Sequence, residues 1–526
     1  YGFFWFSLQA SGGQVDTAGE LPVLRGSWAE VLRRRAPLAR ALAQWLPTRR
    51  WYAGKELTSR EVVVEDMVPL RHPETDVSLL IVRVGFTEGD DHRYAVPVMR
   101  ATGRLATLAA SDTPGAIIAS LDDGALLVDA MVGPDGAMAV VAAALTRRTI
   151  AGRHGAARGL PRRSGIGRLI QSSRDLVPLG VEQSNSLVIV ANQLIAKLVR
   201  RLEPGPNPDV ELPVHLTARG FAQVPGVAAT LEIDLLAESL PADVVIVHDA
   251  ITNEGDLWSW TLDELAIGIE NRGEFGGAND QTHWMAELLG HRTAELHAAL
   301  SASVGTTDLA PLPFTLLWQR SLLQTLRNGV RTTQRALARA KLDTPAALAL
   351  RQPADVVLRR FDTLRTTKLD ALRIRVHGDL HLGQILRSGN DITFIDFEGE
   401  PGRPIGERRI MRSPLTDVAG LLRSVDYAGR SALDTAVARG LVAEADRPQV
   451  DLSRSTWTRA TCATITDSYL ATVADAGLVP ADRSAADLLL DAYALHKGLY
   501  EVRYELANRP DWVHWPLEAV SEMIRP

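Results

Sequence analysis

The residues with the clearest capacity for chemistry lie in two short segments near position 380. Residues 375–384 read Arg-Val-His-Gly-Asp-Leu-His-Leu-Gly-Gln, and residues 394–398 read Phe-Ile-Asp-Phe-Glu. They place Asp379 five positions before Gln384, and Asp396 twelve positions after Gln384. A carboxylate, an amide and a second carboxylate at these spacings are what phosphoryl transfer from a nucleotide requires.

Each part of this chemistry has a candidate residue. Phosphoryl transfer needs a metal ion that neutralises phosphate charge and a carboxylate that aligns the attacking hydroxyl group. We expect Asp379 to accept or orient the proton of the substrate hydroxyl. Gln384 and Asp396 supply hard oxygen ligands, which suit Mg²⁺. Each acidic residue alone could be a helix cap or a surface ion pair, but the three together favour catalysis.

The reaction also needs a fixed cation on the phosphates, and Lys197 is the candidate because it interrupts an apolar strand. A buried lysine requires a partner, and Glu211 at the start of the next expected helix is the natural one. Ser184, Asn185 and Ser186 form the turn before this strand pair, so their polar groups could cover the nucleotide phosphates. The alternatives are a lysine whose head reaches solvent from an edge strand, and a turn without a binding role.

One face of an expected helix near the C-terminus suits a sugar. Lys497, Tyr500, Glu501 and Tyr504 lie at positions i, i+3, i+4 and i+7, so they share one helix face. Aromatic faces beside charged groups match the apolar rings and polar edges of a sugar. Trp512 could extend this platform or belong to the core. The alternative is an interface stripe with an intrahelical Lys–Glu pair.

The elements that must position these residues fall into two halves. Strands are predicted at 61–65, 77–82, 94–98, 187–190, 194–199 and 244–249. A helix is predicted at 27–46, where Ser27 and Glu30 form a capping box. A second is predicted at 135–145 with Asp135 as its cap, and another begins at 209. Beyond 255 the periodicity is helical, as at 283–301, 316–341, 417–427 and 485–508, apart from a strand pair around 374–396. This order predicts an α+β protein with two lobes and a cleft between them.

Composition excludes several classes of protein. The 526 residues are 23% charged and 46% hydrophobic, which is ordinary for a globular protein with several structural units. The net charge of -6 argues against general affinity for nucleic acid. A single cysteine excludes internal disulfides and fits a cytoplasmic location. No apolar run reaches the roughly 18 residues that a membrane-spanning helix needs, so we expect no membrane association.

Two segments stand apart from this pattern. Residues 147–168 contain seven arginines among glycines, which indicates a solvated mobile loop or, alternatively, an electrostatic docking patch. The first six residues include five aromatics and predict a strand within 1–10, followed by a linker at 11–26. Because a lone aromatic strand cannot bury itself, we expect a fragment of a longer polypeptide. The alternative is a strand that docks on this protein's own surface.

The chemistry-bearing residues resemble those of the bacterial maltokinases, relatives of the aminoglycoside phosphotransferases within the protein-kinase-like fold. The resemblance runs from about residue 30 to the C-terminus. It rests on segments 50–55, 182–186, 207–212, 377–384, 396–401, 413–420 and 497–512. Gln384, where many kinases have Asn, follows the maltokinase pattern. So does Asp-Phe-Glu-Gly-Glu at 396–400, where protein kinases have Asp-Phe-Gly.

This resemblance implies a bilobal kinase-like fold with a cap subdomain at 27–112, a nucleotide-binding subdomain at 113–252 and a mostly helical C-lobe at 253–526. It implies ATP and Mg²⁺ as cofactors. The implied reaction transfers the γ-phosphate to the anomeric hydroxyl of maltose, giving maltose 1-phosphate for α-glucan synthesis. We also assign His381 and Glu398 to the substrate site.

The aromatic strand at 1–10 resembles the closing strand of the C-terminal β-domain of trehalose synthases of the α-amylase type. Such enzymes make maltose and are sometimes fused to maltokinases, so the resemblance implies a trehalose synthase as covalent or functional partner. Two alternatives stay open: a related sugar kinase, such as one acting on glucosamine, and a kinase-like binding module without activity. The second predicts loss of Lys197, Asp379 or Asp396, and all three are present.

Overall fold

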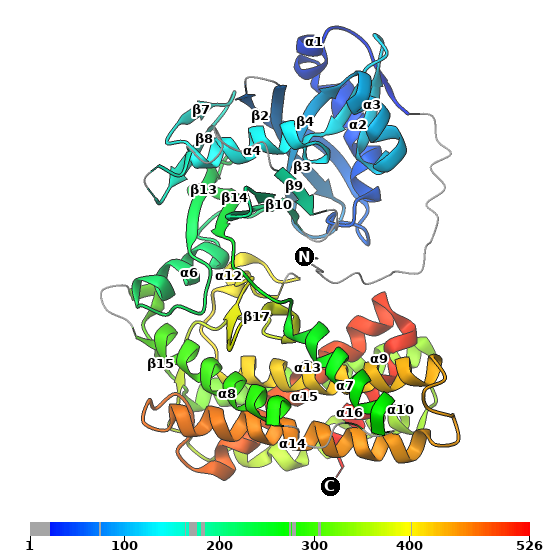
Figure 1. The fold of residues 1–526 in the computed structure, drawn as a ribbon, viewed down its shortest axis with the longest axis vertical. Coiled ribbons are helices and arrows are strands. Elements are labelled where there is room, and N and C mark those ends of the chain that lie inside the picture. Colours follow the sequence, from blue (N-terminus) through cyan, green and yellow to red (C-terminus); the bar gives the residue numbers. More distant parts are fainter. Residues whose placement is uncertain are drawn as a thin grey trace. The chain divides into compact units, whose positions relative to one another are not determined.

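The structure is a computed structural model that describes residues 21–72, 75–163, 165–167, 176–179, 185–272, 275, 280–302, 307–400 and 402–525. The chain divides into two compact units. Unit 1 comprises Tyr1–Val214, Pro225–Thr252 and Pro401–Ile405, and unit 2 comprises His215–Val224, Asn253–Glu400 and Gly406–Pro526. Figure 1 labels the helices and strands for which there is room. The finer domain boundaries stay predictions.

The first sheet of unit 1 is built around three long antiparallel strands, β2 (Ser59–His72), β3 (Thr75–Phe86) and β4 (His92–Ala101). They contain and extend the three strands predicted between 61 and 98. The sheet continues from β4 through β6 (Leu126–Asp129) and β5 (Ile117–Leu121) to β1 (Val23–Leu24), and β12 (Arg201–Leu202) also pairs with β4. Helix α3 (Gly103–Asp112) follows β4.

The helix predicted at 27–46 is two helices, α1 (Trp28–Arg33) and α2 (Arg35–Trp45). The capping box is present, because the backbone N–H of Ser27 donates to the Glu30 carboxylate over 2.9 Å. The chain breaks at Arg34, whose φ and ψ of -82° and 77° are not helical. Pro37 explains the break: its ring would clash with the carbonyl group of Arg33 in a continuous helix.

The second sheet of unit 1 has the order β7 (Thr149–Ala151), β8 (Ala156–Pro161), β13 (Val227–Ile233), β14 (Ala242–Asp249), β11 (Leu194–Leu198), β10 (Ser186–Val190) and β9 (Leu176–Leu179). The hairpin predicted from the strands at 187–190 and 194–199 is therefore confirmed, because β10 pairs with β11. Its turn places Ala191 and Asn192 at a φ of 52° each. Because β11 lies between β10 and β14, Lys197 does not lie on an edge strand, and the alternative of a lysine reaching solvent from an edge is wrong.

The described part of the basic segment at 147–168 is not a loop. Residues 149–161 form the hairpin β7–β8, and β8 extends the second sheet by pairing with β13. The Asp66 carboxylate accepts the backbone N–H groups of Arg153 and Gly155 at 2.7 and 2.9 Å, which ties the hairpin turn to β2. Arg158 pairs with Asp234. Arg168, the last arginine of the segment, lies outside the described residues.

Helix α4 (Pro134–Leu145) packs against both sheets of unit 1, and its side chains belong to the same core as theirs. We expected Asp135 to cap this helix, but the cap is Gly133 and Asp135 lies in the first turn. Pro134 explains the shift, since its fixed φ favours the first helical position. The helix predicted from 209 is α6 (Pro208–Ala218).

Unit 2 is mostly helical, as predicted. Its long helices are α7 (Leu257–Arg272), α8 (Asp280–Ser301), α9 (Leu316–Ala340), α13 (Leu415–Ala438), α14 (Arg447–Val473) and α15 (Arg483–Asn508). Shorter helices are α10 (Pro345–Leu350), α11 (Ala354–Val357), α12 (Ile405–Arg408) and α16 (His514–Met523). Two small sheets pair β15 (Leu312–Pro313) with β16 (Leu372–Arg373) and β17 (Ile385–Ser388) with β18 (Asp391–Phe394). The α+β prediction is confirmed.

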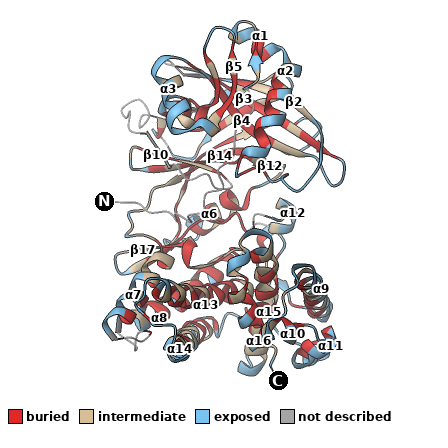
Figure 2. Ribbon diagram, turned by 90° about the vertical axis from the view of Figure 1, so that its right-hand side faces the viewer, coloured by how far each residue is buried: buried red, intermediate tan, exposed pale blue. Residues whose placement is uncertain are grey.

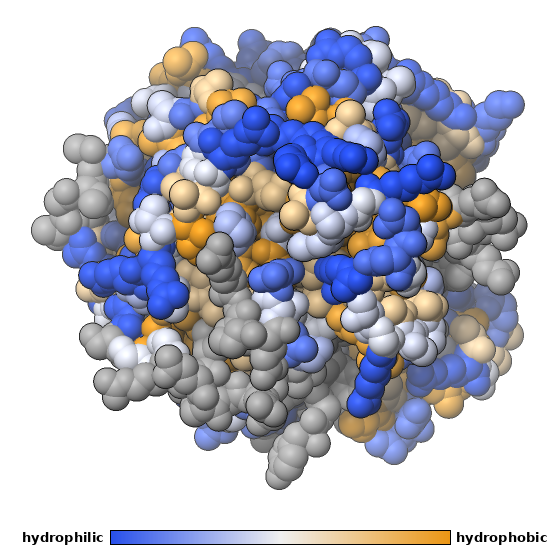
Figure 3. Space-filling model, turned by 90° about the horizontal axis from the view of Figure 1, so that it is seen from above, coloured by the Kyte–Doolittle hydropathy of each residue, from blue (hydrophilic) through white to orange (hydrophobic). Residues whose placement is uncertain are grey.

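Burial follows these elements. Figure 2 shows buried residues along the strands of unit 1 and along α13 and α15 of unit 2. In Figure 3, hydrophobic residues appear as small patches among hydrophilic ones. Among the described helices, none is both long and apolar enough to cross a membrane. The buried face of α13 is unusual because it includes charged residues, which bear directly on the candidate site.

Candidate active site

Helix α13 holds the loop that carries Asp379. The Asp417 carboxylate, in the first turn of α13, accepts the backbone N–H groups of His377 and Gly378 at 2.7 and 2.9 Å. Gly378 has a φ of +89°, and a Cβ atom there would lie 3.2 Å from the Cα of Gly399. The loop therefore needs glycine at this turn, as the sequence predicts.

Asp417 is held in turn by a histidine from another helix. Nε2 of His297, on α8, lies 3.2 Å from Asp417, and its Nδ1 lies 2.9 Å from the hydroxyl of Tyr469 on α14. The ring can therefore donate to Asp417 and accept from Tyr469. Burial raises the pKa of Asp417, but the hydrogen bond and charge of His297 outweigh it, so the pKa is lowered. Asp417 lies in segment 413–420, and the sequence pattern predicts no role for it.

We expect Asp417→Asn to lower kcat by about 100-fold and to change the KM for ATP little, because the loop would lose its fixed orientation. An amide must turn its NH₂ group toward one of the two backbone N–H donors, which leaves that donor without an acceptor. Steady-state kinetics and a thermal melt measure both effects. Asp434→Asn is the matched control, since Asp434 lies on the same helix but pairs with Arg447 and His514. Equal kcat losses in both variants would contradict the assignment.

Asp379 forms an ion pair with Lys497 of α15. Its Oδ1 lies 3.0 Å from the Lys497 Nζ, and the two side chains are 23% and 29% exposed. Burial raises the pKa of Asp379, but the charges of Lys497 and His381 outweigh it and lower the pKa to about 2. Asp379 is therefore ionised at neutral pH. Burial lowers the pKa of Lys497, and the charges of Asp379 and Glu501 raise it above its usual value.

The two predicted metal ligands lie side by side. Nε2 of Gln384, in the 3₁₀ turn η6 (Leu382–Gln384), donates to Oδ2 of Asp396 over 3.0 Å. Asp396 has a φ of 62°, a region that non-glycine residues seldom adopt and that often marks functional sites. An amide oxygen and a carboxylate form a donor set that fits Mg²⁺. Within the described residues, no group of three or more His, Cys, Asp and Glu side chains gathers at a metal-binding distance.

His381 and Glu398 lie beside these ligands. The His381 Nδ1 accepts the backbone N–H of Gly383 at 3.1 Å, which stabilises the 3₁₀ turn. Burial lowers the pKa of His381. Glu398 is buried in the turn after Asp396, where its backbone carbonyl accepts from Arg408 over 3.1 Å. Their assignment to the substrate stays a prediction.

The predicted sugar face divides into an exposed and a buried part. The rings of Tyr500 and Tyr504 stack with centroids 6.0 Å apart, and Tyr504 is 42% exposed. Arg509 continues the row, because its guanidinium lies 5.5 Å from the Tyr504 ring and 4.4 Å from the Trp512 ring. Glu501 turns instead toward Arg423 of α13, at 2.9 Å. Arg509 was missed because an arginine beside a proline signals only a helix end.

In unit 1, Lys197 pairs with a buried carboxylate that the sequence analysis did not assign. The Lys197 Nζ lies 3.0 Å from Oδ2 of Asp209, and the two side chains are 8% and 3% exposed. Nε2 of His248 lies 3.5 Å from the same oxygen. Burial raises the pKa of Asp209, but the charges of Lys197 and His248 lower it well below its usual value. The predicted partner Glu211 lies two residues further along α6.

The predicted phosphate-binding turn is described only from Asn185 onward, and Ser184 lies outside the described residues. Oγ of Ser186 accepts from the Arg200 guanidinium at 3.0 and 2.8 Å, and Oδ1 of Asn185 accepts the backbone N–H of Arg200 at 3.4 Å. Arg200 also pairs with Asp129 at 2.7 Å. The turn is thus fixed to the first sheet, and its role with phosphates stays a prediction.

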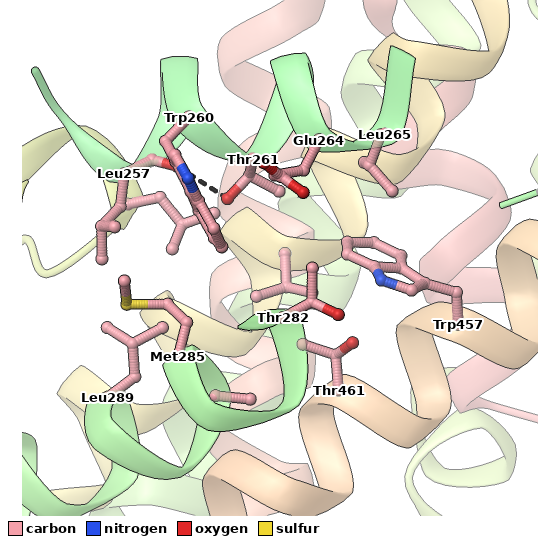
Figure 4. A pocket seen from close by; sticks show the side chains of 13 residues that line it. Leu257, Trp260, Thr261, Glu264, Leu265, Thr282, Met285, Leu289, Trp457 and Thr461 are labelled. Atoms are coloured by element: carbon pink, nitrogen blue, oxygen red, sulfur yellow. Dashed lines mark hydrogen bonds between the residues drawn. The ribbon is translucent and has the colours of Figure 1, made fainter. Parts of the chain in front are cut away.

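A cavity of about 40 Å³ lies in unit 2 among α7, α8 and α14. Figure 4 shows Trp260, Met285 and Trp457 facing it. Leu382 also lines it, so the cavity adjoins the 3₁₀ turn next to Gln384. Its described lining includes one carboxylate, Glu264, and no cation. The cavity therefore lacks the charged groups that phosphoryl transfer needs.

Residues 45–132, which include β2 to β6, match the family model of the maltokinase N-terminal cap domain. This part of the chain is therefore similar to the cap domain of maltokinases. The glucosamine kinase of Streptacidiphilus jiangxiensis is 28% identical over 355 residues, covering 65% of this chain and 72% of that protein. The glucosamine kinase of Mycolicibacterium smegmatis is 26% identical over 357 residues, covering 67% and 81%.

Solved structures show the fold. The complex of glucosamine kinase with glucosamine, ADP and inorganic phosphate has a TM-score of 0.61 and 22% sequence identity, covering 95% of this chain and 100% of that chain. Crystal form B of glucosamine kinase has a TM-score of 0.64 at 21% identity, with the same coverage. The chain therefore shares the fold of glucosamine kinase over nearly its whole length.

Proposed function

We propose that the chain is a sugar kinase that transfers the γ-phosphate of ATP to the anomeric hydroxyl of maltose, giving maltose 1-phosphate and ADP. The observation that carries this proposal is the ion pair between Asp379 and Lys497, the residue that begins the aromatic row on α15. A carboxylate suited to phosphoryl transfer thus adjoins a surface suited to a sugar. The match to the maltokinase cap and the similarity to two glucosamine kinases support the broader assignment to sugar kinases.

The residues take separate roles in this reaction. Asp379 orients the acceptor hydroxyl and takes up its proton, and Lys497 fixes the direction of the carboxylate. Lys197, held by Asp209, supplies the fixed cation for the nucleotide phosphates. Gln384 and Asp396 would hold Mg²⁺, which when bound neutralises phosphate charge.

The length of the aromatic row favours a disaccharide. Tyr500 and Tyr504 lie near the end of α15, and Trp512 lies in the 3₁₀ turn that follows it. Arg509 lies against the rings of Tyr504 and Trp512. A single sugar ring covers about one aromatic side chain, so the second glucose unit of maltose has a surface of its own.

Glucosamine is the second candidate acceptor, because the two similar proteins reported above are glucosamine kinases. Against it stands the length of the aromatic row, because the single ring of glucosamine would cover only about one of its aromatic side chains.

A panel of acceptors tests the proposal. Purified protein with ATP and Mg²⁺ is incubated with maltose, glucose, glucosamine or an aminoglycoside, and ³¹P NMR identifies the phosphorylated position. We expect an anomeric phosphate on maltose. Phosphorylation of glucosamine but not maltose would overturn the choice of sugar. Tight nucleotide binding without transfer to any acceptor would favour a binding module.

A further inference from the structure

A buried network of charges runs through α13 behind the aromatic row. Arg423, Asp426 and Arg430 are all buried and lie within two turns of this helix. Nη1 of Arg423 donates to Asp426 over 2.9 Å, and Nε of Arg430 donates to the same carboxylate over 3.0 Å. Arg454 of α14 reaches Asp426 at 3.2 Å. Arg430 and Arg454 therefore suffice to neutralise Asp426, and Arg423 is not needed for this.

The second partner of Arg423 is Glu501 on α15. Nε of Arg423 donates to Oε2 of Glu501 over 2.9 Å, and the side chains are 4% and 12% exposed. Glu501 lies four residues after Lys497, a spacing at which a lysine and a glutamate on one helix can pair. In the structure each has another partner, because Glu501 faces Arg423 and Lys497 contacts Asp379.

We propose that Arg423 is a positioning residue that holds Glu501 away from Lys497, so that Lys497 stays on Asp379. The proposal rests on the role given to Asp379 in the proposed function. Asp379, Lys497, Glu501 and Arg423 then form an alternating row of charges that extends from the reacting carboxylate into α13.

The physical reason is competition for one ammonium group. The carboxylates that raise the pKa of Lys497 are Asp379, Glu501 and Glu400. With Arg423 present, the negative charge of Glu501 is compensated from the α13 side. Without it, the low local dielectric strengthens the attraction between Glu501 and Lys497, and the lysine is drawn along its own helix away from Asp379.

The test is a double-mutant cycle with Arg423→Met and Glu501→Gln. We expect Arg423→Met to lower kcat by roughly 30-fold with less change in the KM for ATP. In Arg423→Met/Glu501→Gln the competing charge is gone, so kcat should return to within about threefold of Glu501→Gln alone. A double variant no more active than Arg423→Met would overturn the proposal.

Arg430→Met is the matched control, because Arg430 shares the buried carboxylate of Asp426 but pairs with Glu518 rather than Glu501. It should lower the melting temperature as Arg423→Met does while leaving kcat near wild type. An equal loss of kcat in Arg430→Met would show a general packing effect and overturn the proposal.

A second measurement does not depend on the acceptor. In a crystal structure of the Arg423→Met variant, the Lys497 Nζ should lie on the Glu501 carboxylate, and in the double variant it should lie on Asp379. Lys497 on Asp379 in both structures would contradict the proposal. The kinetic measurements use whichever sugar the wild-type protein phosphorylates. If it phosphorylates none, the proposed function fails. The crystal structures still decide the role of Arg423 in that case.

Discussion

Asp379→Asn should lower kcat by about 10³-fold or more while nucleotide affinity is largely kept. The amide keeps the size of the side chain but cannot accept the hydroxyl proton. It also loses the charge that attracts Lys497 at 3.0 Å. Single-turnover kinetics measure the chemical step, and calorimetric titration with ADP measures the affinity.

The pKa of Asp379 adds a pH dependence with a definite sign. Since that pKa is lowered to about 2, its carboxylate stays ionised through mildly acidic pH, and kcat should not fall there by protonation of Asp379. Asp391→Asn is a suitable control, because Asp391 forms a part-exposed ion pair with Arg292 outside the loop. Near-normal activity of Asp379→Asn would remove the residue from its role.

Asp209→Asn should lower kcat/KM for ATP by about 100-fold and the free energy of unfolding by about 3 kcal/mol. The substitution removes the carboxylate that the structure places 3.0 Å from the Lys197 Nζ, in surroundings where both side chains are buried. A lysine charge is costly to bury without its counter-charge. Nucleotide kinetics and urea denaturation measure the two effects.

Glu211→Gln is the variant for comparison, and it tests the partner that the sequence suggests. Glu211 is only partly buried, so water screens its charge more than it screens that of Asp209. We expect the smaller loss for Glu211→Gln in both measurements. The reverse order would show that Glu211 is the carboxylate on which the lysine depends.

The comparison of these two carboxylates shows what the sequence leaves open. A lysine in an apolar strand needs a buried acidic partner. The first turn of α6 contains two acidic residues, Asp209 and Glu211. The choice between them depends on how the helix is rotated against β11, which a local pattern does not contain. The ion pair between Arg423 and Glu501 is even harder to predict from the sequence, because 78 positions separate the two residues in the chain.

Local patterns did predict the elements that carry the site. The hairpin β10–β11, the long helices of unit 2 and the turn at Gly378 follow from periodicity or from residue-specific backbone preferences. The hairpin β7–β8 was not predicted because its arginines and glycines suggest a loop. Its strand character comes from pairing with β13, about 70 residues away. Tertiary pairing there overrides composition.

The contacts around Asp417 have a consequence for how the chain folds. They join His297, His377, Asp417 and Tyr469, which lie on three different helices and a loop across more than 170 residues of sequence. Such non-local contacts form slowly because long stretches of chain must first be brought together. Helix formation alone therefore does not fix the loop that carries Asp379. We expect this loop to order only after α8, α13 and α14 have docked, which makes it one of the last parts of the chain to take its final conformation.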